Sequence, residues 1–477
     1  MVQMHKKILV PIVLPWLLAE LVAYNPLLSY VIAWLGSFLI FHLSLQVPFR
    51  YQHFPLHQQI MRPLILIQLI FAGFMCCSSI FYFVDHLGYS HTGFNENSFF
   101  LTSSKTALIA KCQRLALLAH IGLAYGLILG NKGQYLIKFQ LAKPGTAFLI
   151  KLCTISYGLA LVLNEFPALI QFKYNLTYIS ISSGSLVFVA GIVRKNLPGF
   201  LFGSSVCLFN LVQASLSGYK EAIIVQLILL LFLLFPHYKK ITLLLLLPIL
   251  YLCMYILPTF SSVIRAQSWI SKKTEKEASM AAVETFFDTD KADFIVENNW
   301  LFLTNRFSEI DMFSQFVAQT PSQRPYSPQI LSNAMQALIP KALWPDKPST
   351  EYVAMQRVYE YGVIQKASAA SAKTRPIVDA YLIGGPIVVF VAMLWYGLTA
   401  QWLCQTAERL FGGYQLGCIV IFNGIFQQLW RGNTFEFLFN NILYGYLLMY
   451  LIFIFLKLNH ILIPVKSHEN TTHQSIL

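Results

Sequence analysis

Long apolar runs alternate with short polar connections along almost the whole chain. A helix of about 20 apolar residues spans the roughly 30 Å hydrocarbon core of a bilayer. Because lipid offers the backbone no hydrogen-bond partners, helices are the expected structure for these runs. Hydropathy along the chain predicts about twelve spans, at residues 8–24, 27–47, 63–84, 108–130, 146–163, 176–193, 199–217, 222–237, 241–257, 379–403, 414–430 and 437–457.

The predicted spans leave one long polar segment, which divides the chain into four parts. We expect an N-terminal bundle of about nine helices at 1–257, a large loop at 258–378, further membrane helices at 379–460 and a tail at 461–477. The first span follows MVQMHKK directly and is not followed by a small-residue cleavage site, so we expect it to be retained. The predicted fold class is all-α, polytopic, with one large loop outside the bilayer.

The composition agrees with a membrane protein and limits the classes of partner. Hydrophobic residues make up 56% of the chain and charged residues 12%, whereas about a quarter of a soluble domain is charged. The net charge of +13 lies mostly in short loops, where topology and anionic lipids explain it, so nucleic acid is not an expected partner. The cysteines lie in or at the edges of predicted spans, so neither a disulfide framework nor a metal site is expected.

Lysine and arginine also predict the orientation of the chain. Short loops rich in these residues stay on the cytoplasmic side of a membrane. Every second connection is basic, beginning with Lys6 and Lys7 and ending with Lys457 and Lys466. Both termini are therefore predicted to be cytoplasmic, and the loop at 258–378 extracytoplasmic.

The large loop contains two notable stretches. NWLFLTNRFSEIDMFSQFVAQTP has apolar residues spaced mostly three and four apart, which predicts one amphipathic helix with Arg306 and Glu309 on the same face. IPKALWPDKPS, residues 339–349, contains three prolines that impose an extended, turning backbone. Its Trp344, Lys341 and Lys347 suit either a simple interfacial anchor or a contact with phosphate groups.

Several cations lie at the predicted outer ends of spans, where the orientation rule does not explain them. A charge inside a membrane costs about 2.5–3.5 kcal/mol on insertion scales, so cations at one rim suggest a shared anionic partner. Arginine binds phosphate bidentately and lysine adds a point charge. Each residue alone is equally explained by snorkelling or by an ion pair such as Lys220 with Glu221. The rim cations are Lys220, Arg265, Arg306, Arg375 and Arg431, and Lys105, Lys111 and Arg114 would join them if the fourth span began near residue 115.

Three features of the chain together resemble the Wzy-like family of bacterial polysaccharide polymerases. They are SGYKEA, a long loop containing NRFSEIDMF, and LIPKALWPDKPS. The resemblance implies a GT-C-like glycosyltransferase without a cofactor in the bacterial inner membrane. It would join undecaprenyl-pyrophosphate-linked oligosaccharide units at the outer face into an O-antigen or exopolysaccharide. Membrane lipids, a flippase and a chain-length regulator are the implied partners.

This chemistry suggests roles for the candidate residues. Cations placed at the departing pyrophosphate stabilise the transition state, and a carboxylate serves as general base for the acceptor hydroxyl. The expected catalytic residues are Arg306, Arg265 and Arg431, with Glu309 as the base and Glu221 and Asp346 as reserves. The expected substrate-binding residues are Lys220, Lys341, Lys347, Arg375, Trp344 and Asp346.

Two other functions are compatible with a polytopic chain. An O-antigen ligase resembles this layout, but its large loop carries a functional histidine, and the sequence from 258 to 378 contains none. A transporter or flippase of lipid-linked oligosaccharide would place charges or paired helix breaks near the bilayer midplane and have short loops. The long loop and the rim cations favour the polymerase.

The topology can be tested with a reporter enzyme fused after residue 300. We expect a reporter that works in the periplasm to be active and one that works in the cytoplasm to be inactive, because the loop is predicted to lie outside the cytoplasm. A control fusion after Lys240 should give the reverse pattern. A cytoplasmic signal at residue 300 would overturn both the orientation and the proposed chemistry.

Overall fold

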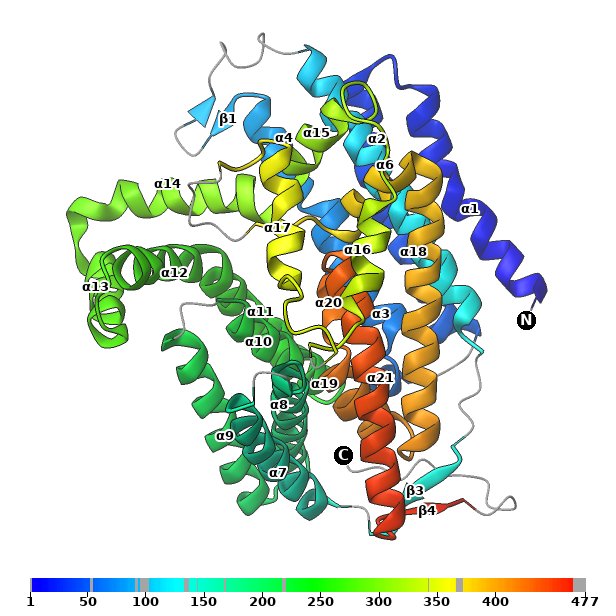
Figure 1. Ribbon diagram of the computed structural model, residues 1–477, viewed down its shortest axis with the longest axis vertical. Helices are drawn as coiled ribbons and strands as arrows, with labels where there is room; N and C mark the ends of the chain where they lie inside the picture. Colours follow the sequence, from blue (N-terminus) through cyan, green and yellow to red (C-terminus); the bar gives the residue numbers. More distant parts are fainter. Residues whose placement is uncertain are drawn as a thin grey trace.

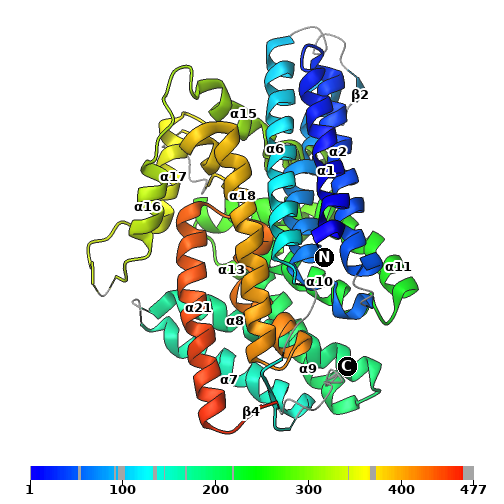
Figure 2. The same cartoon turned by 90° about the vertical axis from the view of Figure 1, so that its right-hand side faces the viewer.

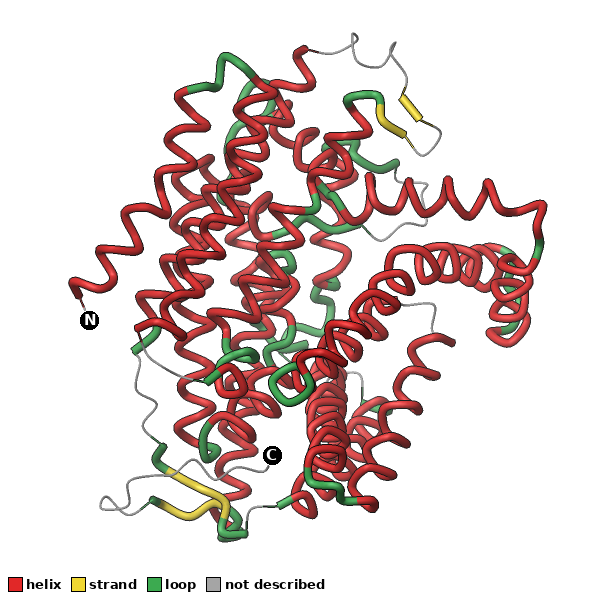
Figure 3. Tube along the Cα trace, turned by 180° about the vertical axis from the view of Figure 1, so that it is seen from behind, coloured by secondary structure: helices red, strands yellow, loops and turns green. Residues whose placement is uncertain are grey.

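The protein folds as a bundle of helices with a lateral arm. The computed structural model describes residues 2–51, 55–90, 93–94, 103–132, 137–143, 145–166, 169–216, 220–341, 343–365 and 372–465. About 80% of the structure is helical, which confirms the all-α class. Strands occur as two short antiparallel pairs within these residues, β1 (Tyr89–Ser90) with β2 (Gly93–Phe94) and β3 (Phe139–Leu141) with β4 (Leu462–Pro464) (Figure 3).

The described residues include nine helices long and apolar enough to cross a membrane. They lie at Pro26–Phe49, Pro63–His86, Ser104–Gly130, Thr146–Asn164, Ile170–Val193, Leu197–Leu216, Lys239–Ser268, Pro376–Leu410 and Phe435–Leu458. Shorter apolar helices at Ile8–Leu21, Ala222–Leu234 and Tyr414–Ile425 coincide with the three remaining predicted spans. The chain is therefore a membrane protein by composition and length, and the count of twelve spans stays a prediction.

The first half of the chain forms most of the bundle. Its elements are α1 (Val2–Leu21), α2 (Pro26–Gln46), η1 (Val47–Tyr51), η2 (Leu56–Gln58), α3 (Pro63–Ile67), η3 (Gln68–Cys77), α4 (Ser79–His86), α6 (Ser103–Gly130), α7 (Thr146–Asn164), α8 (Ile170–Val193), α9 (Leu197–Leu216), α10 (Lys220–Leu234) and α11 (Lys239–Tyr251).

The second half adds the arm (α12 to α14), the outer helices (α15 to α17) and the last bundle helices (α18 to α21). These are η5 (Leu252–Ile256), α12 (Leu257–Arg265), η6 (Ala266–Ile270), α13 (Glu275–Phe287), η7 (Thr289–Lys291), α14 (Ala292–Phe302), η8 (Leu303–Phe307), α15 (Ile310–Gln319), α16 (Gln329–Ala337), α17 (Thr350–Glu360), α18 (Pro376–Leu410), η9 (Tyr414–Phe422), α19 (Asn423–Ile425), α20 (Gln428–Arg431) and α21 (Phe435–Leu458).

The helices α6 and α18 pack against each other at the centre of the bundle (Figure 2). Glycines on both helices let the backbones approach, as in many membrane helix pairs. A Cβ atom at Gly126 would lie 2.1 Å from the carbonyl oxygen of Leu394, and one at Gly397 would lie 2.5 Å from that of Leu123. The closest contact in the bundle therefore depends on small residues.

The helix that leads into the arm extends further in the structure than in the sequence prediction. The predicted span ends at residue 257, but the helix continues without a break through α12 and η6. Arg265 consequently lies inside a helix instead of in a loop. Figure 1 shows α12, α13 and α14 extending sideways from the bundle, with α14 returning towards α4. Trp300 at the end of α14 donates a hydrogen bond to Asp85, at 2.6 Å.

The helix α18 is interrupted near its beginning, at Gly384 and Gly385, just before Pro386. Gly385 has a φ of 70°, a conformation that glycine adopts without steric cost. The loop before α16 packs at this break, since the Ser327 amide donates to the Leu382 carbonyl at 2.9 Å. The Tyr326 hydroxyl would lie 2.7 Å from a Cβ atom at Gly385. The break is therefore a docking point for the outer helices.

Replacing Gly385 by alanine should lower the stability of the protein. With a φ of 70° and a ψ of −155°, residue 385 lies in a region that is essentially restricted to glycine and costs another residue about 1–3 kcal/mol, and the Tyr326 hydroxyl would have to move. The midpoint of thermal unfolding in detergent measures the effect. Gly158→Ala in α7 is the matched control, because a Cβ there meets no atom within 4 Å. Equal midpoints for the two variants would contradict this account of the break.

Candidate functional site

An ion pair joins the large loop to the start of α18. The Arg375 Nε atom donates to Glu309 Oε2 at 2.7 Å, and Nη2 donates to Oε1 at 2.8 Å. The remaining nitrogen, Nη1, donates to the Gly432 carbonyl at 3.1 Å. Three segments far apart in the sequence thus meet at one guanidinium. We call this contact between Glu309, Arg375 and Gly432 the clasp.

The clasp stabilises the charged form of Arg375. Burial alone would lower the pKa of Arg375, but the Glu309 carboxylate and its hydrogen bonds outweigh burial and raise that pKa above its ordinary value. Three of the five guanidinium N–H groups thus have acceptors in the protein, and two of those acceptors belong to Glu309. The structure therefore joins the expected base to one of the expected phosphate ligands.

Arg306 differs from Arg375 in its environment. It lies in the short helix η8, is exposed, and has no carboxylate within ion-pair distance among the described residues. The chain on its C-terminal side is held to the bundle, because the Ser78 hydroxyl donates to the Phe307 carbonyl at 2.8 Å. Arg306 is therefore a solvent-facing cation, three residues before Glu309 of the clasp, on a backbone that is held to the bundle.

The prediction that Arg306 and Glu309 share one continuous helical face is wrong. The helix η8 ends at Phe307 and α15 begins at Ile310, so Ser308 and Glu309 form the junction between two helices. The bend lets Glu309 turn to Arg375 while Arg306 remains in solvent. Apolar residues spaced mostly three and four apart on both sides of the junction made the sequence look like a single helix.

The other expected catalytic cations lie in different surroundings. Arg265 is half-buried at the end of α12, on the arm. Arg431 is half-buried at the end of α20, directly before Gly432, so its backbone neighbours the clasp. The side chains of Lys220 and Glu221 lie outside the described residues. Among the described residues of this set, Arg431 is the one whose backbone neighbours the clasp, through Gly432.

A second polar group lies where α4, α6 and α15 meet. Lys105 Nζ lies 3.3 Å from Asp311 Oδ1, and the Tyr82 hydroxyl donates to the same oxygen. The helix α6 begins at Ser103, not near 115, so Lys105 and Lys111 are helical residues. Lys105 nevertheless contacts the large loop. Arg114 instead pairs with Glu20, at 3.0 Å, on the far side of α6.

The proline-rich stretch from 339 to 349 is held by one of its lysines. The Lys347 ammonium donates to the Ala337 carbonyl at 2.7 Å and to the Ile339 carbonyl at 2.8 Å, and so caps the end of α16. Burial, with a smaller contribution from Lys341, lowers the pKa of Lys347. Trp344 is half-buried, whereas Lys341 and Asp346 are exposed. Lys347 thus has a structural contact that the sequence did not indicate.

The largest ionic group that the sequence analysis missed is a buried network around Arg357. Its guanidinium contacts both Asp379 in α18 and Glu436 in α21, and it also donates to the Thr374 hydroxyl at 3.1 Å. The second Asp379 oxygen accepts from the Phe435 amide at 2.9 Å, which satisfies the start of α21. Arg357 is 6% exposed. A single buried side chain of α17 therefore ties the outer helices to two bundle helices.

The sequence contained a weak signal for this network. Asp379 and Glu436 lie at the ends of predicted spans, and a carboxylate at the edge of a membrane requires a partner. Arg357, the partner of both, lies about 20 residues before Asp379 and about 80 before Glu436. Its helix carries several other charges, so sequence spacing does not identify it. Only the packing of α17 against α18 and α21 singles out Arg357.

The residues best arranged for a metal ion, among those described, are Cys404, Glu408 and Cys418, whose ligand atoms lie within 4.8 Å of one another. The Glu408 carboxylate is already bound bidentately by Arg62, at 2.8 and 2.9 Å. This guanidinium supplies the positive charge that a metal would bring. The group therefore fits a buried ion pair better than a metal centre.

Comparison with known proteins gives one match. A family model described as a domain of unknown function (DUF8712) matches residues 14–464, which is nearly the whole chain. No curated protein and no solved structure matches the chain. The likeness to Wzy-like polymerases therefore rests on the motifs of this sequence alone.

Removing Arg357 should destabilise the fold strongly. Breaking a buried ion pair by removing one partner costs about 3–5 kcal/mol, because the remaining charge stays buried. Arg357→Met keeps much of the side-chain volume, and we expect a loss of that size in chemical denaturation in mixed micelles. Lys291→Met, which removes an exposed pair with Asp288, is the control and should have little effect. Similar midpoints for both variants would show that the network contributes nothing.

Proposed function

The chain belongs to the DUF8712 family, whose function is unknown, and we propose that it is a glycosyltransferase that polymerises lipid-linked oligosaccharide units. The donor and the acceptor are both carried on undecaprenyl pyrophosphate in this proposal. The reaction takes place at the outer face of the bacterial cytoplasmic membrane, with both termini of the chain in the cytoplasm and about twelve spans.

The observation that carries the proposal is the exposed Arg306, which has no carboxylate within ion-pair distance among the described residues and lies three residues before Glu309 of the clasp. A guanidinium binds phosphate oxygens bidentately, and an exposed one needs no rearrangement to do so. Arg431 adjoins the same place from another segment. Arg265 lies on the arm, so its part in the reaction would require an extended substrate or a movement of the arm.

The proposed reaction breaks one C–O bond and forms another. A hydroxyl oxygen of the acceptor sugar attacks the anomeric carbon of the donor chain. The bond from that carbon to the pyrophosphate breaks, and its electron pair leaves on the phosphate oxygen. Arg306 stabilises this developing charge, and the hydroxyl proton passes to a carboxylate, for which Glu309 is the first candidate.

The clasp suggests how Glu309 becomes available as a base. Two hydrogen bonds from Arg375 occupy both oxygens of the Glu309 carboxylate, so neither oxygen faces an acceptor hydroxyl in the clasp. A phosphate that competes for Arg375 would release Glu309 close to the bound donor. In this scheme the base is freed only when the anionic substrate is present.

A flippase or transporter of lipid-linked oligosaccharide is the second candidate. It is favoured by the break in α18 at Gly384 and Gly385, since discontinuous helices often form transport sites. The buried pair of Arg62 and Glu408 places charge inside the bundle, as many transporters do. The polymerase remains preferred because the large loop and Arg306 have no necessary role in transport.

The deciding experiment deletes the gene in its host and analyses the extracted surface glycans by gel. Under the proposal, long chains disappear, single lipid-linked units accumulate at the outer face, and wild-type protein restores the polymer. Arg306→Ala should give less than about one per cent of wild-type polymer while remaining in the membrane, because one lost transition-state contact costs 10²–10³ in rate. Arg306→Lys should restore little if bidentate binding matters.

Lys291→Ala is the control for the Arg306 variants, because it removes an exposed cation of the same segment that lies on the arm. It should leave the polymer unchanged. Full-length polymer with Arg306→Ala would refute the assignment of Arg306. Single units trapped at the inner face after deletion would favour the flippase.

A further inference from the structure

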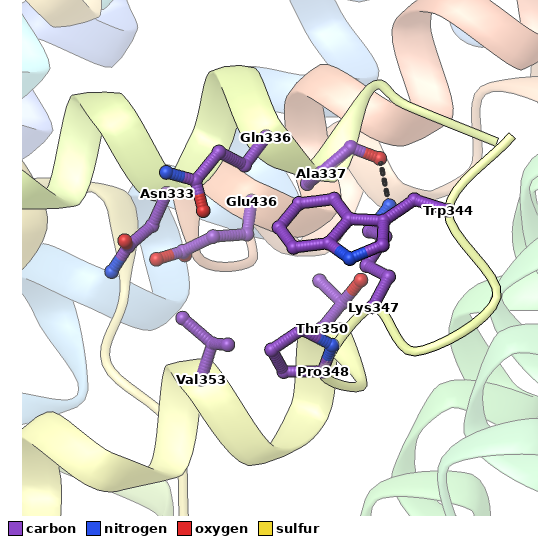
Figure 4. Close-up of a pocket in the computed structure, with 9 residues that line it drawn as sticks. All are labelled: Asn333, Gln336, Ala337, Trp344, Lys347, Pro348, Thr350, Val353 and Glu436. Atoms are coloured by element: carbon purple, nitrogen blue, oxygen red, sulfur yellow. Dashed lines mark hydrogen bonds between the residues drawn. The ribbon is translucent and has the colours of Figure 1, made fainter. Parts of the chain in front are cut away.

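Two hollows among the described residues differ in what they can hold. One lies beside the proline-rich turn, where the Lys347 ammonium donates to the Ala337 carbonyl, and its volume of about 20 Å³ admits a single water-sized group (Figure 4). The other has a volume of about 390 Å³, which is in the range of small-molecule sites. The second hollow is therefore large enough for part of an organic ligand.

The larger hollow is a groove between two helical faces, and we call it the arm groove. One wall is the end of α11 together with η5, and the other is α14, which returns from the arm to the bundle (Figure 1). Within each wall the lining residues lie three or four positions apart, as on one face of a helix. They are Leu250, Tyr251, Met254, Tyr255, Val296, Asn299, Trp300 and Leu303.

One wall of the arm groove belongs to a surface that a membrane would cover with lipid. The helices α11 and η5 are part of the candidate span Lys239–Ser268, most of which is exposed. Leu243, Leu244 and Leu247 precede the groove on the same helix and are exposed. A surface of this kind lies against hydrocarbon chains in a bilayer. The occupant of the groove is therefore apolar along most of its length.

The two ends of the groove lie at different depths. Lys239 and Lys240 mark one end of the span, and Thr259 lies 20 residues further on, which is about 30 Å of helix and the thickness of the hydrocarbon layer. Asn299 is at the level of Thr259, because its Oδ1 atom accepts from the Thr259 hydroxyl at 3.0 Å. Leu250 lies nine residues deeper. The groove thus runs from the edge of the hydrocarbon layer into its interior.

Asn299 brings a hydrogen-bond donor to this edge. Its side chain is 5% exposed, and its Nδ2 atom has no hydrogen-bond partner among the described residues. A buried amide without an acceptor costs the protein free energy, and hydrocarbon offers it none. The occupant therefore combines an apolar chain with an acceptor oxygen near the end of that chain.

The charge of the groove limits what that acceptor can be. Its lining residues, all of them described, carry no formal charge. A phosphate buried against neutral side chains would lose its hydration without gaining a counter-ion, which is strongly unfavourable. An ester carbonyl is an uncharged acceptor, and in a phospholipid it lies between the acyl chain and the headgroup. An isoprenoid phosphate has no such group between its chain and its charge.

We propose that the arm groove binds one acyl chain of an ester-linked membrane phospholipid, with the ester carbonyl on Asn299 Nδ2. A methylene group is close in size to a water molecule, whose share of liquid volume is about 30 Å³, so the groove holds on the order of ten methylenes. The chain fills the space between η5 and α14 and so holds the arm against the bundle. This inference is independent of the proposed function.

The test titrates the purified full chain, in non-ionic detergent, with two lipids and counts bound lipid by native mass spectrometry. The probes are dioleoyl phosphatidylglycerol and its diether analogue, which has the same chains and headgroup but no carbonyl. Wild type should bind the ester lipid about three- to tenfold more tightly, which is the effect of one hydrogen bond. Asn299→Leu should abolish this difference, because it removes the donor and keeps a side chain of similar size.

Val296→Trp should weaken the binding of both lipids about tenfold or more, because the larger ring would fill the groove. Leu301→Trp is its matched control, since Leu301 lies on the same helix, is 48% exposed and does not line the groove. It should bind both lipids like wild type. The comparison of the two lipids on wild type requires no variant, so it decides the question even if a variant fails to fold.

Three results would overturn the proposal. Equal affinity of wild type for the ester and the ether lipid would remove the role of the carbonyl. Equal effects of Val296→Trp and Leu301→Trp would show that the lipid binds elsewhere on the surface. Displacement of the phospholipid by undecaprenyl phosphate at equal mole fraction would show that the groove takes an isoprenoid chain instead.

Discussion

A buried charge must be paired, and the Arg357 network is the place where this constraint organises the molecule. Its guanidinium lies in an outer helix, while its two carboxylates belong to helices that are candidates to cross the membrane. Because leaving any one of these three buried groups unpaired is costly, the network favours one position of the outer helices relative to the bundle. The clasp depends on that position, since it combines Glu309, between η8 and α15, with Arg375 directly before α18.

The backbone of the bundle is adapted to the same arrangement. Glycines bring α6 and α18 close together, and the break at Gly385 receives Tyr326 from the loop ahead of α16. A continuous α18 would leave no room for this contact. The outer helices are thus held at two places, by packing at the break and by charge at Arg357.

The clasp and Arg306 present the guanidinium groups that the proposed transferase for lipid-linked sugars needs at its pyrophosphate. Neither the clasp nor the Arg357 network is formed by one segment of the chain alone.

The sequence by itself determined the class of the protein and most of its helices. Apolar runs of membrane length are a local property, so hydropathy placed the spans to within a few residues in most cases, and the unusual cations at Arg306, Arg375 and Arg431 were visible as exceptions to a pattern. The sequence did not indicate that α11 continues into the arm, because polar residues after 257 look like the start of a loop. Only the tertiary structure decided which charges are paired. It paired Arg375 with Glu309, turned Lys347 to the end of α16, and paired Glu436 with Arg357, because partners as far apart in the chain as Arg357 and Glu436 meet only through packing, and packing is not a local property.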